Sequence, residues 1–169
     1  NHFFIQPNND LRPTIQNNFL NGNNILKFGN NINYLSSSFE YSLTNDFTIN
    51  IVYKNNFKTL LAYFLSSDID VGVWLGGTFG NRGIGVYDGV NDAFWQNNTY
   101  SYDWVLITVT NDSLFLNGNY VLTSGGLGDR VIESFNFDKI GACLAYPNAH
   151  FSGYVGDILI FNQTLNTAT

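Results

Sequence analysis

Phe47-Thr48-Ile49-Asn50-Ile51-Val52-Tyr53 is the stretch that decides the fold class of this chain. Every second residue from Phe47 to Tyr53 is apolar, whereas Thr48 and Asn50 between them are polar. Successive side chains of a β-strand point to opposite faces, so this alternation predicts a strand that covers a core on one side.

Outward from this stretch, the next strong pattern is a hairpin. Val105-Leu106-Ile107-Thr108-Val109-Thr110 is followed, after a short turn, by Leu114-Phe115-Leu116. Asn117-Gly118 then precedes Asn119-Tyr120-Val121-Leu122, and Asn-Gly favours a two-residue turn because both residues reach positive φ at low cost. The run from Val155 to Phe161 predicts the last strong strand.

Weaker strand patterns fill much of the remaining chain, and no segment predicts a convincing helix. They lie at about 25–29, 32–36, 59–65, 71–75, 83–87, 92–96 and 138–142. Pro7 and Pro13 break residues 1–20, which we expect to be an irregular N-terminal segment that adds an edge strand or wraps the core. Without a repeat or linker, residues 1–169 predict a single all-β domain, an antiparallel β-sandwich.

The composition excludes some classes of partner. The net charge is −6 and the seven Lys and Arg residues are scattered, whereas nucleic-acid binding needs a clustered basic face. No apolar run approaches the 18 or so residues that span a membrane. A weakly charged chain that opens with Asn1 predicts part of a longer protein at an extracellular, cell or virion surface.

Four blocks of the chain resemble one family, in the right order from about residue 25 to 165. They are Leu26–Leu35, Phe47–Tyr53, Trp104–Gly118, and Ile140-Gly141 together with Phe151–Leu165. These blocks are similar to the laminin G-like and pentraxin-like branch of the concanavalin A-type lectin and glucanase domains. The resemblance implies a concanavalin A-like jelly roll, and the strand that follows Trp104 places this residue in the core.

The chain lacks the residue patterns of the enzymes that share this fold class. Glycoside hydrolases use two carboxylates, usually Glu, but Glu40 and Glu133 lie in separate segments without a motif. Asp68-Ile69-Asp70 has the alternate spacing that would put two carboxylates on one face of a strand, but no further acid follows. The lone cysteine, Cys143, is expected to be a small buried hydrophobe. We therefore predict a protein that is not an enzyme.

Residues 66–102 carry the richest mixture of aromatic, amide, carboxylate and basic side chains, which is the chemistry that binds sugars. Trp74 and Tyr87 are equally explained as core or face-filling residues. Trp95 is expected on or beside the ligand surface, so that Trp95→Ala would weaken binding more than folding. The ligand-binding candidates are Trp74, Arg82, Tyr87, Asp88, Asn91, Asp92 and Trp95.

Calcium is the cofactor that the resemblance suggests, since it is common in relatives and is held by carboxylate and amide oxygens. Asp88 and Asp92 flank a turn and supply oxygen ligands at useful spacing, and Asp157 in the closing strand is a second candidate. Solvated turn acids would show the same pattern, so this alternative stays open.

Two hypotheses of function follow. The first is a non-catalytic module that binds a carbohydrate or a cell-surface receptor, as an adhesin or the tip of a viral, phage or bacterial fibre. The second is a structural or oligomerising module of a larger fibre protein, for example a trimer. Neither hypothesis includes nucleic-acid binding or membrane insertion.

Overall fold

A computed structural model describes residues 4–29, 32–56, 61–76, 83–96, 103–121, 131–146 and 148–165. Its one short helical element, a 3-10 turn at Asn9–Leu11, precedes the first strand. In the described part of the chain, no helix has the length and apolarity needed to cross a bilayer.

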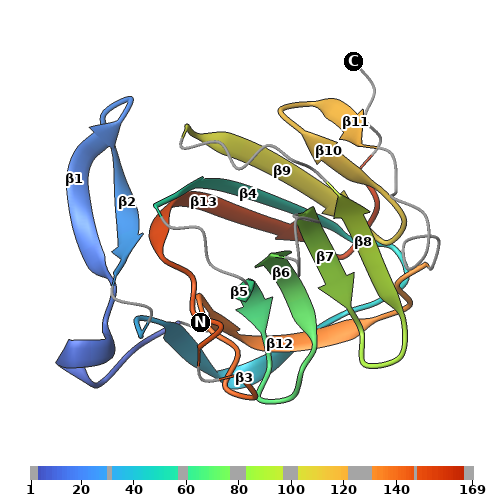
Figure 1. Ribbon diagram of the computed structural model, residues 1–169, viewed down its shortest axis with the longest axis horizontal. Coiled ribbons are helices and arrows are strands. Elements are labelled where there is room, and N and C mark those ends of the chain that lie inside the picture. Colours follow the sequence, from blue (N-terminus) through green and yellow to red (C-terminus); the bar gives the residue numbers. More distant parts are fainter. Residues whose placement is uncertain are drawn as a thin grey trace.

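Within these described ranges, thirteen strands form two antiparallel sheets that lie face to face (Figure 1). The seven-stranded sheet has the order β1 (Thr14–Leu20), β2 (Asn23–Phe28), β13 (Gly153–Phe161), β4 (Thr48–Asn55), β9 (Val105–Thr110), β10 (Leu114–Leu116), β11 (Asn119–Val121). The six-stranded sheet has the order β3 (Leu35–Leu43), β12 (Phe135–Ile140), β5 (Leu61–Ser66), β6 (Gly72–Gly76), β7 (Gly83–Tyr87), β8 (Asp92–Gln96). The predicted all-β jelly-roll sandwich is confirmed.

Alternation along the strands builds the core between the two sheets. Ile49 and Ile51 of β4 are fully buried, as the opening pattern predicts. Aromatic rings from both sheets meet in this core: Tyr53 lies edge to face with Phe64 at 4.7 Å, and Phe64 lies 4.9 Å from Phe151 in a tilted arrangement (centroid distances). Such contacts add to the hydrophobic gain of burying large rings.

The Asn-Gly turn between β10 and β11 is also confirmed. Asn117 and Gly118 have φ values of 49° and 81°, the pair of positive angles that this two-residue turn requires. The Oδ1 atom of Asn117 accepts a hydrogen bond from the backbone N–H of Leu106, 2.9 Å away, which ties the turn to β9.

Two edge strands can be compared with the sequence-based expectation. Residues 14–20 form an edge strand, β1, as one of the two expected alternatives; its pairing with β2 is irregular between Gln16 and Leu20, where Asn18 has a φ of 52°. The strand expected at 32–36 begins only at Leu35 and continues to Leu43. Its first half, Leu35–Ser38, carries three consecutive serines and shows no apolar alternation, and only its second half places Tyr41 and Leu43 toward the core.

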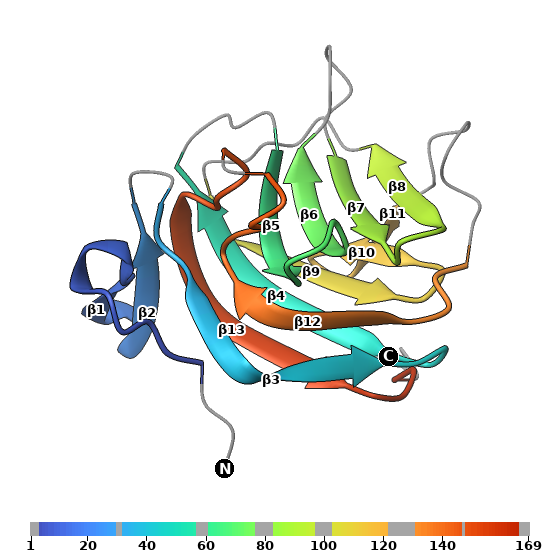
Figure 2. The same cartoon turned by 90° about the horizontal axis from the view of Figure 1, so that it is seen from below.

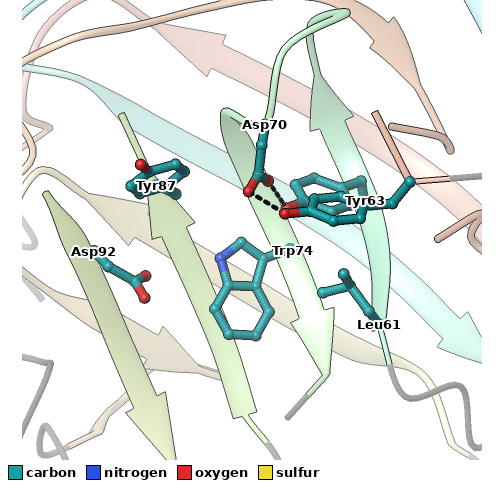
Figure 3. Close-up of a pocket in the computed structure, with 7 residues that line it drawn as sticks. Leu61, Tyr63, Asp70, Trp74, Tyr87 and Asp92 are labelled. Carbon is teal, nitrogen blue, oxygen red and sulfur yellow. Dashed lines mark hydrogen bonds between the residues drawn. The ribbon is translucent and has the colours of Figure 1, made fainter. Parts of the chain in front are cut away.

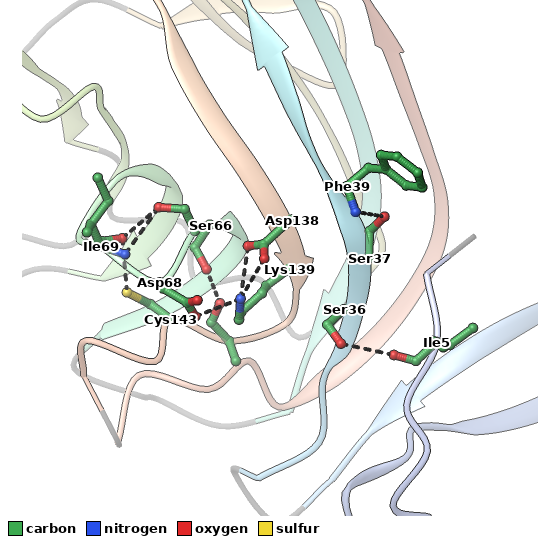
Figure 4. A network of polar contacts seen from close by, with 12 residues as sticks. Ile5, Ser36, Ser37, Phe39, Ser66, Asp68, Ile69, Asp138, Lys139 and Cys143 are labelled. Carbon is green, nitrogen blue, oxygen red and sulfur yellow. Dashed lines mark hydrogen bonds and ion pairs between the residues drawn. The ribbon is translucent and has the colours of Figure 1, made fainter. Parts of the chain in front are cut away.

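A buried cation links the six-stranded sheet to the loop after β5 (Figure 4). The Nζ atom of Lys139, which is 4% exposed, lies 2.7 Å from Asp68 and 2.8 Å from Asp138. A buried ammonium needs such partners, so Asp68 has a structural role in this network. Cys143 beside it is buried as expected, and burial raises the pKa of its thiol.

Candidate functional site

The outer face of strands β5–β8, which points away from the core, carries the candidate site. Figure 2 shows these four strands side by side, with the segment between β12 and β13 lying against β5. Hydrogen bonds fix that segment: Tyr63 N–H donates to Ala149 O, and Gly141 N–H donates to Phe64 O. Side chains from β5–β8 and from this segment therefore share one face.

A stacked pair of aromatic rings crosses the middle of this face. Trp74 of β6, Gly85 of β7 and Phe94 of β8 are direct partners across the three strands. The Trp74 and Phe94 rings are 5.2 Å apart and nearly parallel, at 11°. A Cβ atom on Gly85 would collide with the indole, so glycine is what lets the Trp74 ring lie flat on the sheet.

A pocket of about 190 Å³ opens beside the indole (Figure 3). Aromatic, acidic and aliphatic side chains line it: Leu61, Tyr63, Asp70, Trp74, Tyr87, Asp92 and Tyr146. Trp74 lies in the middle, with Tyr87 and Asp92 on one side and Leu61 and Tyr63 on the other. The pocket thus combines a flat apolar surface with groups that form hydrogen bonds.

Asp70 organises one wall of the pocket. Its Oδ1 atom accepts a hydrogen bond from the Tyr63 hydroxyl, and its Oδ2 atom accepts one from the Tyr146 hydroxyl at 2.8 Å. Burial, reinforced by the bond to Asp70, raises the pKa of Tyr63 far above its usual value. The same carboxylate raises the pKa of Tyr146. Both hydroxyls stay protonated at ordinary pH and remain fixed by Asp70.

The prediction that Trp95 lies on the ligand surface is wrong. Its side chain is 0% exposed and belongs to the main core between the sheets. Because side chains alternate along β8, Trp95 and Ala93 point inward whereas Asp92 and Phe94 point outward. Asp92, one of the polar residues near Trp95 in the sequence, belongs to the outer face of β8.

Among the remaining candidates, the structure brings Trp74, Tyr87 and Asp92 together in the pocket. Asp88 and Asn91 lie instead in the β7–β8 turn, where the Asp88 Oδ1 atom accepts the N–H groups of Val90 and Asn91 at 2.9 and 2.6 Å. Burial acts to raise the pKa of Asp88, but these hydrogen bonds outweigh it and hold the pKa below its usual value. Arg82 lies outside the described residues.

Calcium binding stays a prediction. The described residues contain no cluster of three or more His, Cys, Asp or Glu side chains suited to a metal ion. The Oδ2 atom of Asp88 also accepts the Asn91 side-chain amide, at 3.1 Å. The other two predicted calcium ligands lie on different sheets: Asp92 belongs to β8 of the six-stranded sheet, and Asp157 is exposed on β13 of the seven-stranded sheet.

A second aromatic cluster lies on the seven-stranded sheet. Trp104, expected in the core, is half-buried outside it, 6.3 Å from Tyr154 and 6.5 Å from Phe19 (centroid distances). Phe19 is 48% exposed and stacks on Tyr154, so the cluster holds the β1–β2 hairpin against β13. The three tryptophans thus occupy three environments: the pocket, the core and the opposite sheet.

Four residues that line the pocket were not among the candidates: Leu61, Tyr63, Asp70 and Tyr146. Leu61 and Tyr63 belong to β5, whereas Asp70 and Tyr146 are 76 positions apart in loops, where alternation gives no information about direction. The sequence of β7 does indicate which face carries the site. Gly83 and Gly85, two residues apart, lie on the same face of the strand, and side chains of neighbouring strands can lie flat over them. Trp74 and Phe94 are those side chains.

No family model matches the chain, and no curated protein matches it. Several solved structures share its fold. The heptameric SAP-like pentraxin of Limulus polyphemus aligns with a TM-score of 0.59 at 13% identity, over 98% of this chain and 77% of the pentraxin. The CBM40 domain of the Ruminococcus gnavus IT-sialidase, solved with α2,3-sialyllactose, aligns at 0.54 and 12% identity, over 74% and 80%.

A third structure is domain 4 of AbnA, an extracellular arabinanase from Geobacillus stearothermophilus, solved in complex with arabinotriose. It aligns with a TM-score of 0.51 at 12% identity, over 92% of this chain and 73% of that domain. Together with the topology, these likenesses show that the chain has a pentraxin- and concanavalin-like jelly-roll fold. At such low identity they define the fold, and function has to be argued from the site.

Proposed function

We propose that this chain is a non-catalytic carbohydrate-binding module whose site is the pocket on the outer face of β5–β8. The observation that carries the proposal is the Trp74 indole, held flat over Gly85 against Phe94 and surrounded by hydroxyl and carboxylate oxygens. A flat ring can pack against the C–H face of a sugar, and the oxygens can accept its hydroxyl protons. Sugar sites need both features at once.

The pocket favours binding over hydrolysis. A glycoside hydrolase needs two carboxylates that act directly on the glycosidic bond. Asp70 already accepts tyrosine hydroxyls on both of its oxygens, so it serves to position those hydroxyls. This arrangement suits a fixed recognition surface.

The structural neighbours are consistent with this proposal, since two of them were solved with a saccharide bound. We extend it to the setting: an extracellular or virion-surface protein in which the module contacts glycans or a glycosylated receptor, as an adhesin or a fibre tip. A trimeric arrangement in a longer fibre is compatible with this role, because the pocket lies on the outer face of the six-stranded sheet and none of its described lining residues belongs to the seven-stranded sheet. Light scattering of the full-length protein tests the trimer.

Trp74→Ala is expected to weaken binding at least about tenfold, close to 1.4 kcal/mol, to whichever glycan binds most tightly in a broad array. The loss arises because the variant removes the flat surface on which the sugar packs. Titration calorimetry of the wild type and the variant gives the ratio of dissociation constants.

Trp104→Ala is the matched control, since it also removes a half-buried indole but from the opposite sheet. It should leave the dissociation constant within about twofold of the wild type. Equal losses in the two variants, or no glycan binding by the wild-type protein, would contradict the proposed site.

A further inference from the structure

The tyrosine hydroxyls of the pocket all donate hydrogen bonds to acceptors within the protein. Each hydroxyl carries a single proton. Tyr63 and Tyr146 donate theirs to Asp70, and Tyr87 donates to the backbone carbonyl of Gly89 at 2.9 Å. The raised pKa values of Tyr63 and Tyr146 keep those protons in place. A ligand therefore meets hydroxyl oxygens with lone pairs and no proton to donate.

The acidic side chains add further acceptors. Asp70 and Asp92 line the pocket, and an ionised carboxylate has acceptor oxygens and no donor. The indole N–H of Trp74 is a side-chain donor in this wall, whereas the three tyrosine hydroxyls donate within the protein. The pocket is therefore suited to a ligand that brings donors.

A protonated amine meets this requirement better than any other common sugar substituent. An ammonium group has three donors and a positive charge, and hydrogen bonds from it to carboxylates are about twice as strong as neutral ones. The faces of Trp74 and the tyrosines attract a cation as well. An acetylated amine instead has one N–H and adds a carbonyl oxygen, which would face a wall of acceptors.

We propose that the pocket binds an amino sugar through its free, protonated amine. The inference rests on the proposed carbohydrate-binding function and specifies its ligand class: a hexosamine that is not N-acetylated, as in deacetylated chitin-like polymers. The pocket volume of about 190 Å³ is below the range of sites for drug-sized ligands, so it holds a single sugar ring. The acidic wall disfavours an anionic sugar such as a sialic acid.

Three β-1,4-linked tetrasaccharides with the same glucan backbone test the inference. They carry at C2 an ammonium (glucosamine), an acetamido group (N-acetylglucosamine) or a hydroxyl (glucose). Calorimetry at pH 6 should give at least about tenfold tighter binding of the glucosamine tetramer than of the other two. The advantage should disappear as the pH rises through the pKa of the sugar amine, because the amine then loses its positive charge.

A matched pair of variants separates the pocket from the general attraction of a cation to an acidic protein. Asp92→Asn should reduce the preference for glucosamine at least about fivefold, whereas Asp157→Asn, on the other sheet, should leave it unchanged. Equal or tighter binding of the acetylated or neutral tetramer, lost in Trp74→Ala, would overturn the inference and leave the proposed function standing. Absence of glucosamine binding, or equal effects of the two Asp variants, would also overturn it.

Discussion

Replacing Trp95 with alanine is expected to lower the free energy of unfolding by about 3–5 kcal/mol. The indole is completely buried between the sheets, in contact with the core that both sheets share. Its removal forfeits the transfer free energy of a large ring and leaves a cavity that neighbouring strands cannot fill. Guanidinium unfolding, followed by circular dichroism, measures the loss.

Trp104→Ala again serves as the comparison, with an expected loss of about 1 kcal/mol because the half-buried indole packs against Phe19 and Tyr154 and does not belong to the main core. If Trp95→Ala is too unstable to purify, Trp95→Phe keeps most of the ring and should lose about half as much. A loss below about 1 kcal/mol in Trp95→Ala would show that the residue is not part of the core.

Gly141→Ala should destabilise the fold by about 3 kcal/mol or more, through two separable effects. Gly141 has φ of 89°, which a residue with a side chain adopts at a cost of about 1–2 kcal/mol. A Cβ atom there would also overlap the ring of Phe28, which is fully buried and cannot move without disturbing the core.

Gly118→Ala isolates the backbone effect. Its φ of 81° is similar, but a Cβ atom at this position would meet nothing within 4 Å. Thermal unfolding should therefore show a clearly larger loss for Gly141→Ala than for Gly118→Ala. Similar losses at the two positions would mean that Phe28 is not held as tightly against Gly141 as the structure places it.

The sequence predicts most of the fold because most strands carry one of two strong local signals. The alternation of β4 and the Asn-Gly turn between β10 and β11 each specify geometry with a few adjacent residues. The expected range 83–87 coincides with β7, and 92–96 coincides with β8. The bounds of edge strand β3 were not predicted because its first half is a run of serines, and only Tyr41 and Leu43 near its end pack toward the core.

The site is harder to predict because alternation separates two faces without saying which one is buried. In β8 the candidates therefore included both Asp92, which lines the pocket, and Trp95, which is buried in the core. The glycines of β7 resolve the choice, since they leave room for flat rings on the outer face. Asp70 and Tyr146 depend on long-range folding of two loops, which no local pattern encodes.

The most direct test of the account uses the three indole N–H signals of the tryptophans in a ¹H–¹⁵N spectrum, assigned with single Trp→Phe variants. Trp74 reports the pocket, Trp95 the core and Trp104 the opposite sheet. On titration with the tightest-binding glycan of the array, the Trp74 signal should shift progressively to saturation while the other two stay in place. A shift of the Trp104 signal with Trp74 unmoved, or no shift at all in the presence of saturating glycan, would contradict the central claim that this pocket is a carbohydrate-binding site.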